Sequence, residues 1–237
     1  MDSNISEIMG KIANEAYVNY HKNDLIQSLP QYEVKATQDD LIGSLFPHTF
    51  GFQAMLLQET QSGEYVIAFR GTEGKVWPWN AITDLATDAS MAVGNFTTQM
   101  QMSLAFVDAA LDHYASQGLT RANLSFTGHS LGGSLAEVAG YTFGCDTYAY
   151  NPFGVKWSLE TSPATYIATL LVLEITSEYS TEKITNIVNV GGNFSDPITG
   201  VGSHLLDSYI GDIQYVKNSE GGTLAPHGID ALKEEGT

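Results

Sequence analysis

The chain has 237 residues, 43% of them hydrophobic, with 27 Asp and Glu against 10 Lys and Arg, for a formal net charge of -17. This length and apolar content support one sizeable α/β domain and exclude wholesale disorder. The negative field repels phosphate backbones, so we expect no nucleic-acid partner. It also gives no general attraction to anionic membrane surfaces, so contact with lipid must be apolar.

Several other classes of protein are not expected. Cys145 is the single cysteine, which excludes an internal disulfide, and a buried filling role is expected for it. No apolar run reaches the roughly 20 residues of a membrane span, so stable membrane insertion is not expected. The first residues do not resemble a secretory leader. Low Lys content and strong acidity favour a secreted protein without a cleavable signal peptide, with the cytoplasm as the alternative.

The hydrophobic periodicity predicts helices and strands that alternate along the chain. The expected elements, in order, are a helix over 5–20, strands over 49–58 and 65–70 joined as a hairpin, a helix over 96–116, a strand over 124–126, a helix from Leu131 to near Gly144, a strand over 147–151, a helix over 166–175, strands over 184–190 and 212–217, and a helix over 228–234. This alternation is typical of a mostly parallel sheet covered by helices on both faces. No repeat or linker divides 1–237, so one domain is predicted, and the sequence leaves its oligomeric state open.

The sharpest chemical signal is Gly128-x-Ser130-x-Gly132, between an apolar strand and an amphipathic helix. A serine on a tight strand-to-helix turn has strained backbone angles, and glycine two residues to either side relieves the crowding there. We expect this turn to expose the Ser130 hydroxyl above the sheet edge as a nucleophile. The pattern alone also occurs in other Gly-rich strand-to-helix turns, so its context carries the interpretation.

A serine nucleophile needs a histidine base, and six histidines are present. His21 and His113 fall in or beside predicted surface helices, His48 lies upstream, and His129 belongs to the turn itself. His204 and His227 remain, both downstream of the serine as the α/β-hydrolase order requires. His227 is favoured because it precedes a short terminal helix, whereas His204 closely follows the best candidate acid.

The base in turn needs an acid, and Asp196 is the best candidate. It follows the strand predicted over 184–190, and sites of this kind assemble at the carboxyl ends of parallel strands. Asp146 precedes a strand and therefore falls at the wrong edge. Asp207 and Asp212 stay open as alternatives that lie beyond the expected strand end.

An oxyanion hole needs two amide donors near the serine. The backbone amide of Leu131, directly after the nucleophile, is one candidate. Thr72 is the other, because it follows the strand that ends in Phe69-Arg70-Gly71 and offers both an amide and a hydroxyl. For Arg70 an ion pair that holds the strand end is the expected role.

Three segments in this order resemble the class 3 lipase family, and more narrowly its bacterial lipase and phospholipase A1 branch. Val66–Thr72 with Trp79 and Asp84-Leu85 is similar to the oxyanion strand and lid entry, Phe126–Gly133 to the nucleophile elbow, and Ile187–Asn189 with Asp196-Pro197-Ile198 to the acid strand. The resemblance implies an α/β-hydrolase fold with Ser130, Asp196 and a C-terminal histidine as the triad, and Thr72 and Leu131 as oxyanion donors. At the histidine, His227 matches the branch better than His204.

The family also implies a mobile apolar lid, for which residues 73–84 are the candidate. Its apolar side chains would be Val76, Trp77, Trp79 and Ile82. The two tryptophans could instead fill the core. The expected activity is hydrolysis of lipid esters at an interface, without a metal or cofactor, on triacylglycerol, phospholipid or polyester. Two other readings remain: an inactive lipid-binding module of the same fold, and an acyltransferase that uses the same elbow.

Overall fold

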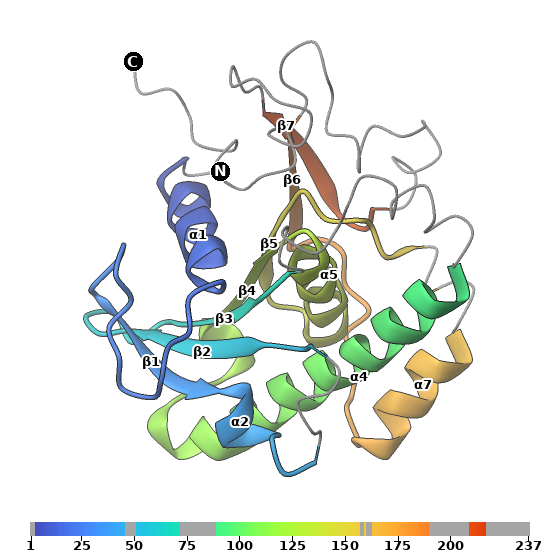
Figure 1. The fold of residues 1–237 in the computed structure, drawn as a ribbon, viewed down its shortest axis with the longest axis horizontal. Helices are drawn as coiled ribbons and strands as arrows, with labels where there is room; N and C mark the ends of the chain where they lie inside the picture. Colours follow the sequence, from blue (N-terminus) through green and yellow to red (C-terminus); the bar gives the residue numbers. More distant parts are fainter. Residues whose placement is uncertain are drawn as a thin grey trace.

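A seven-stranded sheet organises the described part of the chain. The computed structural model describes residues 3–45, 51–71, 89–156, 159, 163–189 and 209–216. The strands lie side by side in chain order: β1 (Tyr32–Thr37), β2 (Ala54–Glu59), β3 (Tyr65–Phe69), β4 (Leu124–His129), β5 (Asp146–Tyr150), β6 (Ile184–Asn189) and β7 (Asp212–Val216). The first three pair antiparallel and β3 to β7 pair parallel, so the chain leaves β3, β4, β5, β6 and β7 at one common edge (Figure 1).

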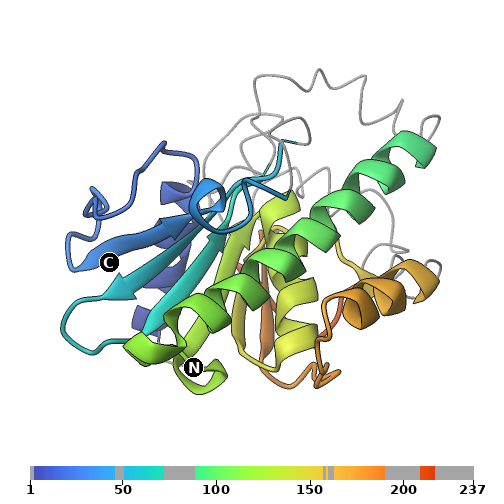
Figure 2. The same ribbon diagram turned by 90° about the horizontal axis from the view of Figure 1, so that it is seen from below.

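Helices cover both faces of this sheet, as the alternating pattern predicts. Helix α1 (Ser3–Glu15) packs on one face, over β3, β4 and β5. Helices α4 (Ala89–Tyr114), α5 (Leu131–Phe143) and α7 (Pro163–Val172) form the layer on the other face (Figures 1 and 2). Among the helices that the structure describes, none combines the length and the apolar character needed to cross a bilayer.

The sheet divides the core into two halves because successive strand residues point to opposite faces. On β3, the side chains of Tyr65, Ile67 and Phe69 pack into the cluster under α4 and α5. Val66 and Ala68, between them, pack into the cluster under α1. All five are buried. A strand buried on both faces reads as a continuous apolar run, which is why the sequence marks it so clearly.

The strand β1 and the short helix α2 (Gln38–Leu41) that follows it were not predicted. The pairing of β1 with β2 shifts register between Val34 and Ala36, which indicates a bulge. Val34 and Ala36 therefore pack into different halves of the core although they are two residues apart. A bulge breaks the period of two on which a strand prediction depends.

The predicted opening helix over 5–20 is wrong at its C-terminal end, because α1 ends at Glu15. The backbone turns after Ala16, where Tyr17 N–H donates to Asn14 O at 3.2 Å. Tyr20, which helical spacing assigned to the apolar stripe, lies beyond the helix and donates its hydroxyl proton to Glu15 Oε2 at 2.5 Å. The other predicted elements with described residues are found with ends shifted, most of all at the N-terminus of α4, which begins at Ala89 rather than at 96.

A fully buried carboxyl lies between α5 and β6. Glu137 and Asn186 are both 0% exposed. The Ile210 amide donates to Glu137 Oε1 at 3.4 Å, and the Ile210 carbonyl accepts from Asn186 Nδ2 at 2.8 Å. Within the described residues, Glu137 Oε2 and Asn186 Oδ1 have no hydrogen-bond partner. Burial raises the pKa of Glu137 well above its ordinary value of 4.5 and so favours the protonated carboxyl.

Replacing Glu137 with glutamine is expected to stabilise the protein increasingly as the pH rises. The raised pKa means that the stability from the neutral carboxyl is complete below about 4.5 and is lost as the pH rises through the folded-state pKa. Wild type therefore loses about 1.4 kcal/mol of unfolding free energy per pH unit in that window. The glutamine side chain keeps the shape of the carboxyl and does not ionise, so it avoids this loss.

Urea unfolding of Glu137→Gln and wild type at about pH 5 and about pH 8 measures this difference. The exposed Glu64→Gln variant controls for the loss of one negative charge. If the free energies of unfolding of Glu137→Gln and wild type differed by the same amount at both pH values, the result would contradict a protonated Glu137.

Candidate active site

Ser130 lies in a sharp turn between the end of β4 and the start of α5. Its backbone angles are φ 58° and ψ -125°, a combination that side-chain-bearing residues rarely adopt and that costs about 1–3 kcal/mol. The turn is held by hydrogen bonds from Ser130 N–H to Tyr150 O at 2.9 Å and from Ser134 N–H to Ser130 O at 3.1 Å. A strained residue fixed in this way indicates a function for its side chain.

The glycines of the motif have the steric role that the sequence predicts. A Cβ placed on Gly128 would overlap the carbonyl of Gly132, and a Cβ on Gly132 would overlap the carbonyl of Phe69. Gly133 also packs closely, since a Cβ there would lie 3.1 Å from Gly128 O. The turn therefore forms only because three backbone segments come closer than any side chain allows.

The exposed hydroxyl expected at Ser130 is not found, because the residue is only 6% exposed. Gly71, just beyond the end of β3, lies against it: a Cβ on Gly71 would be 3.4 Å from Ser130 Cβ. The Ser130 side chain makes no capping hydrogen bond to α5. Ser130 is therefore enclosed between two loops at the sheet edge, which shields a reacting group from bulk water.

Tyr17 connects those two loops, and the sequence analysis did not single it out. Its hydroxyl lies 3.0 Å from His129 Nδ1, and their ring centroids are 6.1 Å apart. The Gly71 backbone N–H donates to the same oxygen. No sequence signal marks this residue, because its partners lie about fifty and more than a hundred positions away and only the fold brings them together.

Leu131 is the first residue of α5. The first backbone amides of a helix have no partner within the helix and carry its positive dipole end. The Leu131 amide is therefore a donor in the right place to face a negative charge that develops beside Ser130.

Arg70 has two neutral partners among its described contacts, and the ion pair expected for it stays a prediction. Its guanidinium donates to Asn19 Oδ1 at 3.3 Å and to Gln53 Oε1. The Arg70 Cζ also lies 5.7 Å from the centroid of the Tyr17 ring, a cation–π distance. Arg70 therefore braces the end of β3 against the segment that follows α1.

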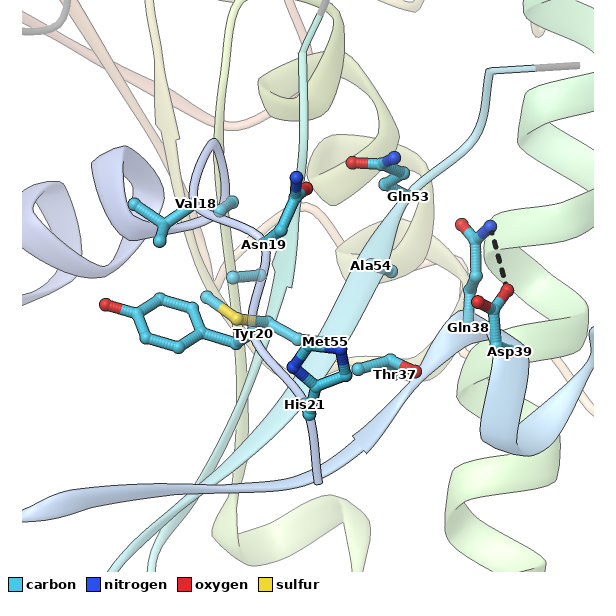
Figure 3. A pocket seen from close by; sticks show the side chains of 12 residues that line it. Val18, Asn19, Tyr20, His21, Thr37, Gln38, Asp39, Gln53, Ala54 and Met55 are labelled. Atoms are coloured by element: carbon cyan, nitrogen blue, oxygen red, sulfur yellow. Dashed lines mark hydrogen bonds between the residues drawn. The ribbon is translucent and has the colours of Figure 1, made fainter. Parts of the chain in front are cut away.

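A pocket of about 450 Å³ opens beside this brace, and its described lining does not include Ser130. Its floor is apolar where Ala54 and Met55 face it from β2, and its rim is polar. Figure 3 shows Asn19 and Gln53, two partners of Arg70, and the hydrogen bond from Gln38 to Asp39 among the residues that line the pocket. Arg70 thus contacts two residues that line the pocket, and Tyr17 contacts both Arg70 and the residue before Ser130.

Most of the other predicted site residues lie outside the described residues. These are Asp196, His227, Thr72, the lid 73–84 with Val76, Trp77, Trp79 and Ile82, the alternatives His204 and Asp207, and the upstream His48. One rejected acid, Asp146, and one alternative acid, Asp212, are described. Asp146 and Asp212 are the first residues of β5 and β7, so they stand at the sheet edge opposite to Ser130.

Three further sequence expectations can be compared with the structure. Cys145 is 0% exposed and its thiol contacts the Arg121 carbonyl at 3.4 Å, as expected for a buried filler. Burial raises the pKa of the Cys145 thiol to about 12, which makes it unreactive. His21 and His113 are exposed, as their surface positions predicted. Within the described ranges, no group of three or more His, Cys, Asp or Glu could hold a metal ion.

The mostly parallel sheet and the serine turn define an α/β-hydrolase fold, and solved structures agree on this fold. The nonglycosylated Lip2 lipase of Yarrowia lipolytica matches with a TM-score of 0.51 and 17% identity over 92% of this chain and 79% of that one. Lipase II of Rhizopus niveus matches with a TM-score of 0.50 and 14% identity over 94% and 84%. A propeptide complex of Rhizomucor miehei lipase matches with a TM-score of 0.51 and 13% identity over 92% and 68%.

The chain belongs to the phospholipase-like family described as the Tle-like phospholipase domain, whose model matches residues 9–165. Comparison with curated proteins gives no significant match. Family and fold together support a carboxylic ester hydrolase, and the predicted α/β-hydrolase fold is confirmed. The narrower resemblance, to the bacterial lipase and phospholipase A1 branch of class 3 lipases, stays a prediction.

Proposed function

We propose that this chain hydrolyses carboxylic esters of lipids, as a lipase or phospholipase A1, through a Ser-Asp-His triad and an acyl-enzyme. The observation that carries the proposal is Ser130 itself, a non-glycine residue held at φ 58° where β4 passes into α5. Ser130 Oγ attacks the ester carbonyl while a histidine takes its proton. The histidine then gives that proton to the leaving alcohol, and water releases the acid from the enzyme.

The order of the strands supports Asp196 and His227 as the other triad members. Strands β4, β6 and β7 are parallel, so the chain leaves all three at the edge where Ser130 lies. Asp196 follows β6 after six intervening residues, and His227 follows β7 after ten. The order of the serine, the acid and the base after these three strands is the one that this fold uses, which supports the assignment.

Two loops at this edge supply the donors for the tetrahedral intermediate. We assign one oxyanion donor to the amide of Leu131 at the N-terminus of α5. The other is Thr72, directly after Gly71, which packs against Ser130. Two amides aimed at the place where the negative charge forms stabilise the transition state more than the ground state.

The substrate is proposed to be a lipid ester at an interface, and the family name favours a phospholipid. Because the chain carries a net charge of -17, apolar groups must make the lipid contact. The described surface offers such groups on α7, where Leu171 and Val172 are 73% and 80% exposed. Residues 73–84 are proposed as the lid, with Val76, Trp77, Trp79 and Ile82 as its apolar side chains. Secretion stays part of the proposal.

Hydrolysis of p-nitrophenyl esters of increasing acyl length, with and without a serine-directed phosphonate, tests this function. We expect turnover that depends on chain length and stops when a single phosphonate adduct forms on Ser130, located by peptide mass spectrometry. Phospholipid and triacylglycerol panels then separate phospholipase from lipase. A chain that gives no turnover and no adduct, even with lipid interfaces present, would contradict the proposal in favour of an inactive lipid-binding module.

A further inference from the structure

The two proposed oxyanion donors come from different parts of the chain, so something must fix the distance between them. The Leu131 amide belongs to the turn after β4, and Thr72 to the loop after β3. A donor displaced by about 1 Å from its productive position can lower the rate by a factor of about 100. Backbone pairing fixes β3 and β4 only as far as Phe69 and Gly128. Beyond that register, other contacts must hold the two loops together.

The Tyr17 hydroxyl is the contact that lies between them. Its oxygen accepts from the Gly71 N–H, in the residue directly before Thr72. It lies 3.0 Å from His129 Nδ1, in the residue directly before Ser130. The Tyr17 hydroxyl donates to His129 Nδ1 or accepts from it, according to the tautomer of the ring. The Tyr17 hydroxyl therefore contacts Gly71, the residue before Thr72, and His129, the residue before Ser130.

Tyr17 is well placed to hold this position. Its ring lies 5.7 Å from the Arg70 guanidinium carbon, and Arg70 is bonded to Asn19 and Gln53. The space around the hydroxyl is filled as well, because a Cβ on Gly71 would overlap the Tyr17 hydroxyl and the His129 carbonyl. His129 is only 7% exposed. A hydroxyl with two directed bonds in such surroundings has little freedom to move.

We propose that Tyr17 is a positioning residue that sets the spacing of the oxyanion hole by bridging the Gly71 amide and the His129 ring. This inference rests on the proposed function. Tyr17 does not touch the substrate or exchange protons with it, and acts through the loop that leads to Thr72 and the turn that carries Ser130. Its effect therefore falls on the transition state rather than on substrate binding.

The test is the Tyr17→Phe variant, which removes the bridging oxygen and keeps the ring. On a soluble p-nitrophenyl ester we expect kcat to fall about 10- to 100-fold with KM nearly unchanged, because the hole is loosened and not lost. The inhibition constant of an alkyl boronic acid, which forms a tetrahedral anion on a catalytic serine, should rise by a similar factor. Thermal unfolding of each variant is measured alongside.

Tyr20→Phe is the matched control. The Tyr20 hydroxyl also has two partners, Glu15 Oε2 and the Gln27 amide, but it lies away from the serine turn. Its removal should leave kcat and the boronic acid affinity at wild-type values, even if it lowers the unfolding temperature as much. A His129→Asn variant, alone and combined with Tyr17→Phe, adds a second measure. A double variant no slower than the slower single variant would show that both residues act through one bridge.

The pH profile separates positioning from acid–base chemistry. Burial raises the pKa of Tyr17 to about 12, so its hydroxyl stays protonated throughout a normal assay range. Wild type and Tyr17→Phe should therefore give kcat profiles of the same shape, differing only in height. A titration step in the wild-type profile that disappears in the variant would contradict a positioning role.

The outcomes distinguish this inference from the function on which it rests. Active wild type with a Tyr17→Phe variant that keeps its kcat, or that changes only KM, would refute the bridge and leave the hydrolase in place. A wild-type chain that neither turns over esters nor forms the phosphonate adduct would refute both. A kcat loss matched by Tyr20→Phe would reduce Tyr17 to a structural residue.

Discussion

Replacing Ser130 with alanine is expected to lower ester hydrolysis by at least about 10³-fold while the protein stays folded. The substitution removes the nucleophile, and the triad residues of serine hydrolases act as a unit, so the loss of one removes most of their joint effect. The oxyanion amides and the bound substrate remain, which leaves a small residual rate. The Ser130 side chain makes no capping bond to α5, so helix stability does not depend on it.

Activity on a p-nitrophenyl ester, phosphonate labelling and thermal unfolding measure this prediction together. Ser125→Ala is the matched control, because Ser125 lies on β4, the strand that leads into the turn, but near its other end. The control should keep both turnover and labelling. A Ser130→Ala protein that still hydrolyses esters, or that still takes up the phosphonate, would remove Ser130 from its proposed role.

Replacing His227 with alanine is expected to lower kcat/KM by at least about 10³-fold, and the same change at His204 far less. The physical reason lies in the order of the strands. β7 is parallel to β6 and leaves the sheet at the edge where Ser130 lies, so a residue after β7 can return to the serine. His204 falls between β6 and β7, only eight residues after Asp196. That short interval gives less room for the acid and the base to reach successive positions around Ser130.

Kinetics of the two alanine variants at several pH values make this comparison. If His227 is the base, the wild-type profile has a step near the ordinary histidine pKa of about 6.5. His204→Ala keeps that step and His227→Ala loses it together with the rate. The opposite ranking would move the base to His204 and would show that the loop after β6 supplies both partners of the serine.

Several parts of the site could be predicted because the local backbone geometry restricts which residue types can occupy neighbouring positions. Gly128, Ser130 and Gly132 are such a case: the turn needs residues without Cβ where the carbonyls of Gly132 and Phe69 approach. The strand β3 could also be predicted, since Tyr65–Phe69 is an apolar run buried on both faces of the sheet. The family model supports the same reading over residues 9–165.

Other features could not be read in this way, because their cause lies between residues far apart in the chain. The bulge in β1 interrupts the alternation of side chains along the strand. Only the pairing with β2 explains why Val34 and Ala36 face different halves of the core. The early end of α1 is a similar case. Apolar spacing continues to Tyr20, but Tyr17 leaves the helix and bonds to His129.

The sequence by itself determined the class of fold and the serine of the proposed site, because hydrophobic period and turn sterics act between near neighbours. Only the tertiary structure decided that Ser130 is enclosed rather than exposed, that Arg70 contacts Asn19 and Tyr17 in the segment after α1, and that Tyr17 joins the loop after β3 to the serine turn. Each of these results comes from the close approach of β3, β4 and the segment after α1. The packing of the whole sheet sets how closely these segments approach, and no local sequence pattern predicts it.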